Sequence, residues 1–296
     1  MKAPGGVKAR GATRTTASIR GRAGRSDGGR LVDESDRSPT MIDRRTREAI
    51  LLRYREGRSR LLLLDYDGTL VPFTTDPAKA APGRALLDML ASLSSEARND
   101  VVIISGRDRQ TLERWFGSRG LSLVAEHGAL LKVRGEGRWR RTGPLSTGWK
   151  KDVRPVVEAF MDRAPGSVLE EKEFSIALHY RGAEPRVGES CALELATAIS
   201  PLSRGLGISI MMGDKVLEIM GSCVSKGVAA CRLLRSKRYD FILAIGDDRT
   251  DEAMFKALPE HSVTVKVGRP PSSAKHRIAD QASVLPFLQE MAGKVP

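Results

Sequence analysis

The sequence lacks any long apolar run. Its 296 residues hold nothing close to the about 18 consecutive apolar residues that a membrane-spanning helix needs. The first residues also lack the apolar segment of a secretory signal, so we expect no membrane partner. With 41% hydrophobic and 29% charged residues, the composition is typical of a globular protein, and the length suffices for one large domain or two smaller ones.

Cysteine is scarce. The chain has three cysteines, at Cys191, Cys223 and Cys231, which is an odd number without any CxxC spacing. This pattern argues against a cysteine-ligated zinc site and against a complete disulfide framework. Reduced thiols in a cytoplasmic protein fit it best.

Large apolar side chains are almost absent from residues 1–30, which carry eight Lys or Arg and one Asp of a chain with net charge +13. Such a segment buries too little surface to offset its ordering entropy, so we predict a disordered basic tail over residues 1–40. A basic tail can contact nucleic acid. We favour a solvated leader, or a true start at Met41, and expect no nucleic-acid partner.

Apolar runs and helical spacing alternate after residue 40. Short, continuously apolar runs predict buried strands over 61–64, 101–104, 238–245 and 262–267. Apolar spacing predicts helices over 43–58, 82–93 and 108–116, the first with Ile50, Leu51, Leu52 and Tyr54 toward the core. This alternation predicts an α/β fold with a doubly wound parallel sheet.

The middle of the chain has a different pattern. It predicts two helices and four strands, over 150–163, 168–171, 174–181, 189–200, 208–212 and 215–220. In 174–181, one face holds Phe174, Ile176, Leu178 and Tyr180, and the other holds Ser175, Ala177, His179 and Arg181. A sheet with one apolar face is typically antiparallel and open on one side. We therefore predict an inserted α+β cap domain over 147–221, between core halves at 41–146 and 222–296.

Polar triplets follow three of the predicted core strands. They are Asp65-Tyr66-Asp67, Ser105-Gly106-Arg107 and Gly246-Asp247-Asp248. Parallel strands end at the same edge of a sheet, where ligands of such folds bind. We expect the three triplets to meet there.

Carboxylates in this arrangement suit phosphate ester hydrolysis. Asp65 can attack phosphorus as a nucleophile, and Asp67 can act as general acid and base. Mg²⁺ shared between Asp65 and Asp247 would offset the repulsion between carboxylate and phosphate. Gly68 and Thr69 would turn their backbone N–H groups toward the phosphate. For two further acids a structural reading stays open, with Asp251 capping a helix over 252–258 and Asp248 as a loop carboxylate.

Several segments together resemble the trehalose-6-phosphate phosphatases, a branch of the haloacid-dehalogenase-like phosphatases with an α/β cap. They are LDYDGTL, ISGR, AEHGALL, EEKEFSIALHYR, KVLEI, SKGVA and GDDRTDEAMF, in order over about residues 45–290. The resemblance implies Mg²⁺ held by the Asp65 carboxylate, the Asp67 carbonyl and Asp247, with Asp248 and Asp251 nearby. We interpret His127, within AEHG, as a turn or core histidine rather than a ligand.

The resemblance also implies the residues that hold the substrate. Phosphate would contact Ser105 and Lys226, with help from Arg107. The sugar hydroxyls would contact cap residues, namely Glu170, Lys172, Arg181 and Glu218, and in addition Lys215 and His179. One departure is that Met220-Gly221 follows KVLEI, where relatives often continue with Arg-Pro.

The resemblance implies Mg²⁺-dependent hydrolysis of trehalose 6-phosphate to trehalose and phosphate through an aspartyl-phosphate intermediate. We also expect association with a trehalose-phosphate synthase. Two alternatives stay open. One is a related phosphatase acting on sucrose phosphate or a glucosyl-glycerate phosphate. The other is a non-catalytic regulatory protein that binds a sugar phosphate, although such a protein would not need to keep both Asp65 and Asp67.

Overall fold

The structure is a computed structural model that describes Met1 and residues 38–74 and 77–293. Most of the predicted basic tail lies outside the described residues. At its end, however, Pro39 is buried and Thr40 pairs with His276 of another strand. The last residues of the predicted tail therefore belong to the fold.

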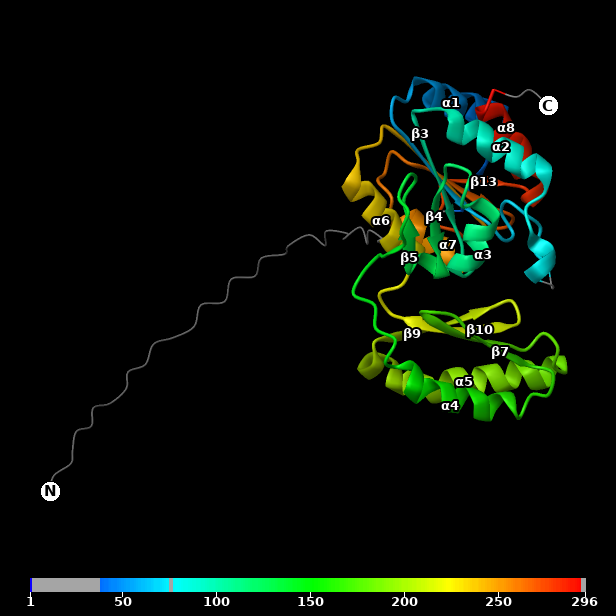
Figure 1. Cartoon of the computed structure of the whole chain (residues 1–296), viewed down its shortest axis with the longest axis vertical. Helices are drawn as coiled ribbons and strands as arrows, with labels where there is room; N and C mark the ends of the chain where they lie inside the picture. The colour runs from blue at the N-terminus through cyan, green and yellow to red at the C-terminus, as the bar shows by residue number, and fades with distance from the viewer. Residues whose placement is uncertain (2–37, 75–76, 294–296) are drawn as a thin grey trace, which may run out of the picture. The chain divides into compact units, whose positions relative to one another are not determined.

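The larger sheet has nine strands among the described residues (Figure 1). In spatial order they are β1 (Thr40–Met41), β13 (His276–Ile278), β12 (Val263–Val267), β11 (Phe241–Gly246), β2 (Arg60–Asp65), β3 (Asn99–Ile104), β4 (Ser122–Ala125), β5 (Leu130–Lys132) and β6 (Arg140–Arg141). The first seven run parallel to one another. β5 is antiparallel to β4, and β6 is antiparallel to β5. The predicted α/β fold with a parallel sheet is confirmed.

Alternate residues of the central strands bury into two helical layers because successive side chains of a strand point to opposite faces. Leu62 and Leu64 of β2 share a cluster with residues of α1 (Arg44–Glu56), α2 (Arg84–Ser95), α3 (Arg109–Phe116) and α8 (Val284–Met291). Leu61 and Leu63 share one with residues of α6 (Lys226–Ser236) and α7 (Arg249–Ala257). Burial on both faces explains why these strands read as unbroken apolar runs.

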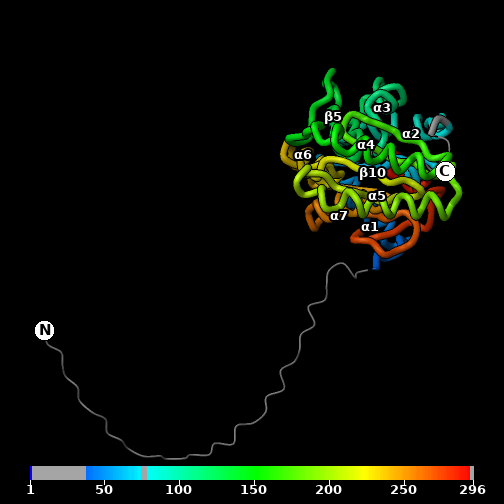
Figure 2. Tube along the Cα trace, turned by 90° about the horizontal axis from the view of Figure 1, so that it is seen from below, coloured from blue at the N-terminus to red at the C-terminus, as the bar shows by residue number. Residues whose placement is uncertain are grey.

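The cap has its own sheet and its own core. Its strands, in spatial order β7 (Val168–Glu171), β8 (Ser175–His179), β10 (Val216–Gly221) and β9 (Ile208–Gly213), are all antiparallel. The helices α4 (Lys150–Met161) and α5 (Pro185–Leu206) cover one face, as Figure 1 and the view from below in Figure 2 show. The other face of the sheet is turned to the core domain. We keep the name cap for residues 147–221, following the predicted division.

Three details differ from the sequence predictions. Leu52 is 55% exposed, because α1 buries only a narrow stripe around Ile50 and Tyr54. Phe174 precedes β8 and packs in the core-domain cluster with Met220, so it leaves the face formed by Ile176, Leu178 and Tyr180. The helix predicted over 189–200 extends in both directions as α5 and ends at Gly207, which has a left-handed backbone.

The carboxyl ends of β11, β2 and β3 lie side by side in the sheet, so the three polar triplets meet as predicted. The short η3 turn (Glu126–Gly128) follows β4 at the same edge. The other short helical turns are η2 (Pro77–Ala80) and η4 (Gln281–Ser283). None of the helices in the described part of the chain is long and apolar enough to cross a bilayer.

Candidate active site

A buried ammonium joins two buried carboxylates at the edge of the core sheet. Asp65 ends β2, and Lys226 begins α6. The Lys226 Nζ donates to Asp65 Oδ1 at 2.6 Å and to Asp251 Oδ1 at 2.8 Å. All three side chains are almost completely withdrawn from solvent. Loss of Lys226 would leave two buried carboxylates without their cationic partner, so the three side chains form one unit.

The start of α7, which supplies Asp251, places two further carboxylates, Asp247 and Asp248, beside this unit. Asp248 is the N-cap: its Oδ1 accepts the N–H groups of Thr250 at 2.8 Å and of Asp251 at 3.3 Å. Asp251 is the third residue of α7, and its Oδ2 accepts the N–H groups of Asp247 at 3.0 Å and of Asp248 at 3.1 Å. The cap of this helix is therefore Asp248 rather than Asp251, and Asp251 links the helix start to Lys226.

Burial and mutual repulsion shift the pKa values of Asp65, Asp247 and Asp251 upward. The pKa of Asp248 is lowered instead, because Lys226 and hydrogen bonds together outweigh the effect of burial. Burial raises the pKa of Asp65 to about 7, an effect that Lys226 opposes and Asp247 strengthens. Burial and the neighbouring Asp251 also raise the pKa of Asp247. Burial alone would lower the pKa of Lys226, but Asp251 and Asp65 hold it well above its usual value. The cluster thus carries more negative charge than its one ammonium offsets.

These carboxylates fit a divalent cation. Asp65, Asp247 and Asp251 each offer one oxygen, and the three oxygens lie within 4.8 Å of one another. Hard carboxylate oxygens are the ligands that Mg²⁺ prefers, and a cation would offset the excess negative charge. Asp251 already accepts hydrogen bonds on both oxygens, so Asp65 and Asp247 are the better placed pair.

Asp67 faces Arg107 instead of the carboxylate cluster. The guanidinium donates to both oxygens of Asp67, from Nε to Oδ2 at 2.8 Å and from Nη2 to Oδ1 at 2.6 Å. Ser105 is 1% exposed, and its Oγ accepts the backbone N–H of Arg107 at 3.1 Å. The first two polar triplets are therefore connected through their last residues.

Gly68 and Thr69 form a tight turn after Asp67. The N–H of Gly68 donates to Val71 O at 2.9 Å, and the N–H of Thr69 donates to Tyr66 O at 3.3 Å. Both N–H groups thus have partners within the turn, and the phosphate contacts predicted for them stay a prediction. Thr69 donates its hydroxyl to Asp247 Oδ1 at 3.0 Å. Gly68 has φ +82° and lies so close to the Asp247 carboxylate that a Cβ would collide with it.

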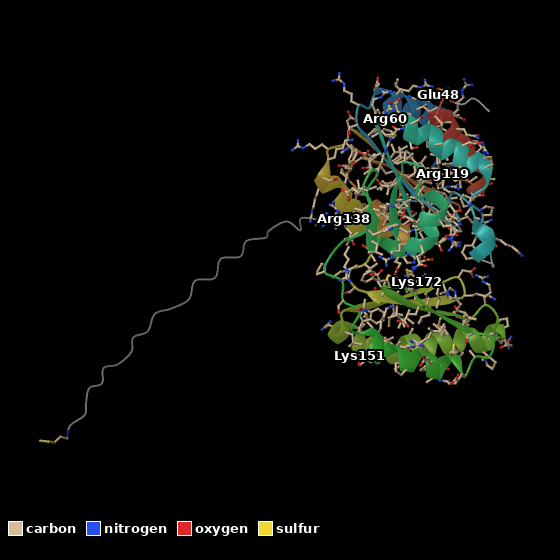
Figure 3. All side chains as sticks on the ribbon, viewed as in Figure 1. Glu48, Arg60, Arg119, Arg138, Lys151 and Lys172 are labelled. Atoms are coloured by element: carbon tan, nitrogen blue, oxygen red, sulfur yellow. The ribbon has the colours of Figure 1, made fainter. Side chains whose placement is uncertain are left out.

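Cap side chains reach the core from β7, β8 and β10. Lys172 donates to Gly106 O at 3.1 Å and lies 3.5 Å from Glu218 Oε1, and Figure 3 places it between the cap sheet and the core. Glu170 Oε2 lies 2.8 Å from His179 Nε2. Arg181 donates to Asp214 Oδ2 at 2.6 Å. The residues predicted to bind sugar therefore form a polar surface opposite the carboxylates.

Two residues that sequence reasoning did not assign to the site tie the cap to the core. Glu126 accepts the N–H groups of Phe174 at 2.7 Å and of Glu173 at 3.2 Å. His127 lies in a turn, as predicted, and its Nε2 is 2.8 Å from Glu218 Oε2. Both have left-handed backbones, at φ 48° and 54°. The sequence could have indicated both residues, because Glu126-His127-Gly128 is a fourth polar triplet after a buried strand. That strand, β4, is not among the predicted strands.

A cleft of about 550 Å³ lies between these two surfaces. From the core it is lined by Asp65, Asp67, Ser105, Arg107, Trp115, His127, Lys226 and Asp248, and from the cap by Glu170, Lys172, His179, Arg181 and Glu218, among others. Its volume falls within the roughly 300–1,000 Å³ of small-molecule sites. Asp247 and Asp251 support it through contacts with Thr69 and Lys226. Lys215 is not among the lining residues, so the structure does not bring it to the cleft.

Known proteins are similar to this chain in sequence. A bifunctional trehalose-6-phosphate synthase/phosphatase of Thermoproteus tenax is 40% identical over 238 residues, which cover 80% of this chain and 32% of the relative. A trehalose-phosphatase of Schizosaccharomyces pombe is 38% identical over 272 residues, covering 86% of this chain and 33% of the relative. The chain thus spans about a third of the length of the curated relatives it matches.

A solved structure agrees with these sequence matches. The C-terminal domain of Candida albicans trehalose-6-phosphate phosphatase aligns with a TM-score of 0.80 at 30% identity, and the alignment covers 88% of this chain and 99% of that domain. A family model described as trehalose-phosphatase matches residues 63–283, a segment that contains every strand-end carboxylate and the whole cap. The chain therefore belongs to the trehalose-phosphatase family.

Proposed function

We propose that the protein hydrolyses trehalose 6-phosphate to trehalose and phosphate, with Asp65 as nucleophile. The observation that carries the proposal is the place of Asp65, buried beside Lys226, Asp247 and Asp251 at the floor of a cleft whose opposite wall is polar. Family membership supports the substrate class, because the related proteins are named trehalose-phosphatases. The cap wall offers charged hydrogen-bonding groups to the sugar hydroxyls.

The residues of the chain account for both halves of the reaction. The Asp65 carboxylate attacks phosphorus, the bond from phosphorus to the sugar oxygen breaks, and Asp67 gives that oxygen a proton. Water then attacks the aspartyl-phosphate, Asp67 takes a proton from the water, and the Asp65 carboxylate and inorganic phosphate are released. Lys226 and Ser105 lie at the cleft floor, where they can stabilise negative charge on the transferred phosphoryl group.

Asp65 and Asp247 would hold Mg²⁺ together with the Asp67 carbonyl. When bound, the ion supplies positive charge that offsets repulsion between the Asp65 carboxylate and the phosphate. The raised pKa values of Asp65 and Asp247 are consistent with a site that needs such charge. Asp248 and Asp251 would stay outside this ligand set, since both are engaged in the capping box of α7.

A panel of sugar phosphates tests the function. We expect phosphate release to be fastest from trehalose 6-phosphate, with the Asp65→Asn variant as the control for contaminating phosphatases. A preference for sucrose phosphate or a glucosyl-glycerate phosphate would replace the substrate but keep the enzyme class. If none of the esters is hydrolysed while trehalose 6-phosphate still binds in calorimetry, the regulatory alternative is correct.

Removal of metal gives the first testable prediction. Because the nucleophile lies within an excess of negative charge, chelation should abolish phosphate release and added Mg²⁺ should restore it. Ca²⁺, which is larger and has irregular coordination, should inhibit. The measurement is the rate of phosphate release across metal titrations. Full activity after exhaustive chelation would rule out the metal site.

The cellular setting is a further part of the proposal. Association with a trehalose-phosphate synthase is supported by a relative that is named as both synthase and phosphatase and is about three times as long as the match. A cytoplasmic location is consistent with three unpaired cysteines, of which Cys223 is exposed. Size-exclusion chromatography of the protein mixed with a trehalose-phosphate synthase would test the association.

A further inference from the structure

Arg107 and Asp67 form a bidentate ion pair that lines the cleft. Two nitrogens of the guanidinium donate to the two oxygens of the carboxylate, at 2.8 and 2.6 Å, and both side chains are largely shielded from solvent. Such a fork holds a carboxylate in one orientation, which a single point charge cannot do. Arg107 therefore determines where the oxygens of Asp67 point.

Aromatic rings hold Arg107 in turn. Its guanidinium carbon lies 4.8 Å from the centre of the Trp115 ring and 5.8 Å from that of Tyr66. Tyr66 is immobilised by its hydroxyl, which donates to Ala80 O at 2.5 Å, and by an edge contact with Phe116. The orientation of Asp67 thus rests on a packed set of side chains between β2 and α3.

We infer that Arg107 is a positioning residue for proton transfer, which aims Asp67 at the leaving oxygen, rather than the phosphate ligand that the sequence suggested. Two of its nitrogens, Nε and Nη2, are committed to Asp67, and Lys226 already supplies the cation beside Asp65. This inference rests on the proposed function, because it assigns Arg107 a role through the general acid of that reaction.

The inference predicts a selective defect. A sugar alkoxide is a poor leaving group and needs the proton, whereas p-nitrophenolate leaves without one. The value of kcat/KM reports only the steps up to departure of the leaving group, so it excludes the later attack of water. For Arg107→Met we expect kcat/KM for trehalose 6-phosphate to fall about tenfold to a hundredfold, the effect of a misaimed catalytic group. The value for p-nitrophenyl phosphate should stay within about twofold.

A double-mutant cycle separates positioning from other roles. In an Asp67→Asn background, Arg107→Met should cause no further loss on trehalose 6-phosphate, because there is no acid left to aim. Arg107→Lys keeps the positive charge but cannot donate to both oxygens in the same way, so its kcat/KM for trehalose 6-phosphate should lie between those of wild type and Arg107→Met. It replaces the Met variant in the comparison if that variant does not fold. Arg84→Met is the matched control, since Arg84 also contacts both oxygens of an aspartate, Asp88, but on the surface.

The outcomes are distinct. Two results would overturn the inference: an equal loss of kcat/KM on both esters, or a full loss from Arg107→Met in the Asp67→Asn background. Arg107 would then bind phosphate or support the fold. A wild-type protein that hydrolyses neither ester would overturn the proposed function itself, and with it this inference, before any variant is compared.

Discussion

Asp65 lies where chemistry and stability oppose each other. Its carboxylate is buried, and the nearby acids Asp247 and Asp251 leave the group with more negative charge than Lys226 offsets. Replacing Asp65 by a neutral residue removes repulsion within the cluster together with the proposed nucleophile. Repulsion within this cluster lowers the free energy of unfolding, as is common for functional sites.

Asp65→Asn should therefore abolish phosphate release while the melting temperature in chelator stays equal or rises. The amide keeps the shape of the side chain but cannot attack phosphorus. Phosphate assays and thermal unfolding measure the two effects, with Asp88→Asn on the surface of α2 as the control. Near-normal turnover by purified Asp65→Asn would exclude this residue as the nucleophile.

Glu218 provides the clearest pH dependence in the cap. Burial alone would raise its pKa, but His127 and Lys172 hold the pKa of Glu218 far below its ordinary value of 4.5. A carboxyl group whose pKa is lower in the folded state stabilises the fold above its unfolded pKa and loses that contribution as the pH falls. Glu218 should thus stabilise the closed cleft at neutral pH and lose this effect below about pH 4.5.

The variant Glu218→Gln should accordingly be less stable than wild type at pH 7, and the gap should narrow as the pH falls below about 4.5. Urea unfolding at a series of pH values measures the gap. Glu48→Gln, at an exposed pair with Arg44, is the control and should show almost no gap at any pH. A gap that stays constant with pH would contradict the charged pairing.

At the scale of elements, β2 carries a buried charge at each end. Opposite Asp65, Arg60 is 1% exposed and has no carboxylate partner among the described residues. Its guanidinium donates to Gly57 O at 2.8 Å, to Arg55 O at 3.1 Å and to Asn99 Oδ1 at 3.3 Å. It also lies 4.1 Å from the centre of the Tyr54 ring. Arg60 thus connects the end of α1 to β2 and β3, at the end of the core away from Lys172 (Figure 3).

Arg60→Met should lower the free energy of unfolding by about 2–4 kcal/mol, because it leaves three acceptors in a buried place without their charged donor. Phosphate release by the folded fraction should be unchanged, since Arg60 lies at the opposite end of the strand from Asp65. Urea titrations measure the loss, with the exposed neighbour Arg58→Met as control. Stability within about 0.5 kcal/mol of wild type would show that packing replaces these hydrogen bonds.

The elements differ in how far the sequence could predict them. Strands buried on both faces were found because unbroken apolar runs have no other common explanation, and their polar ends located Asp65, Asp67 and Asp247. β4 is not predicted because its apolar run, Leu123–Ala125, is only three residues long, and the place of His127 in the cleft is therefore not predicted either. The pairing of Arg107 with Asp67 depends on the register of β2 and β3, which no local pattern contains.

At the scale of the whole molecule, the residues proposed for chemistry and those proposed for recognition come from different sheets. The core sheet supplies the carboxylates and Lys226, and the cap sheet supplies the charged groups of the opposite wall. Phosphate chemistry alone cannot distinguish one sugar ester from another. Selectivity should therefore depend on cap residues that contact the distal sugar, where buried polar groups left unpaired disfavour the wrong substrate.

Glu170→Ala should lower kcat/KM for trehalose 6-phosphate at least about tenfold, the effect of one charged hydrogen bond, and change p-nitrophenyl phosphate hydrolysis little. Steady-state kinetics on both esters measure this. Its neighbour Glu171 is a matched control, because it pairs with Lys150 and Arg154 of α4 and does not line the cleft. Equal losses on both substrates would mean that Glu170 supports cap closure instead of recognition.

The order of strands in the sheet also has a consequence for biosynthesis. β2 lies between β3, which follows it closely, and β11, which is made roughly 180 residues later, after the entire cap. At about 5–20 residues per second, a ribosome needs roughly 10–35 s to bridge that gap. Throughout this time β2, with its four consecutive leucines, has an unpaired edge, which favours association with other chains. The nascent chain, more than the folded protein, should therefore depend on chaperones.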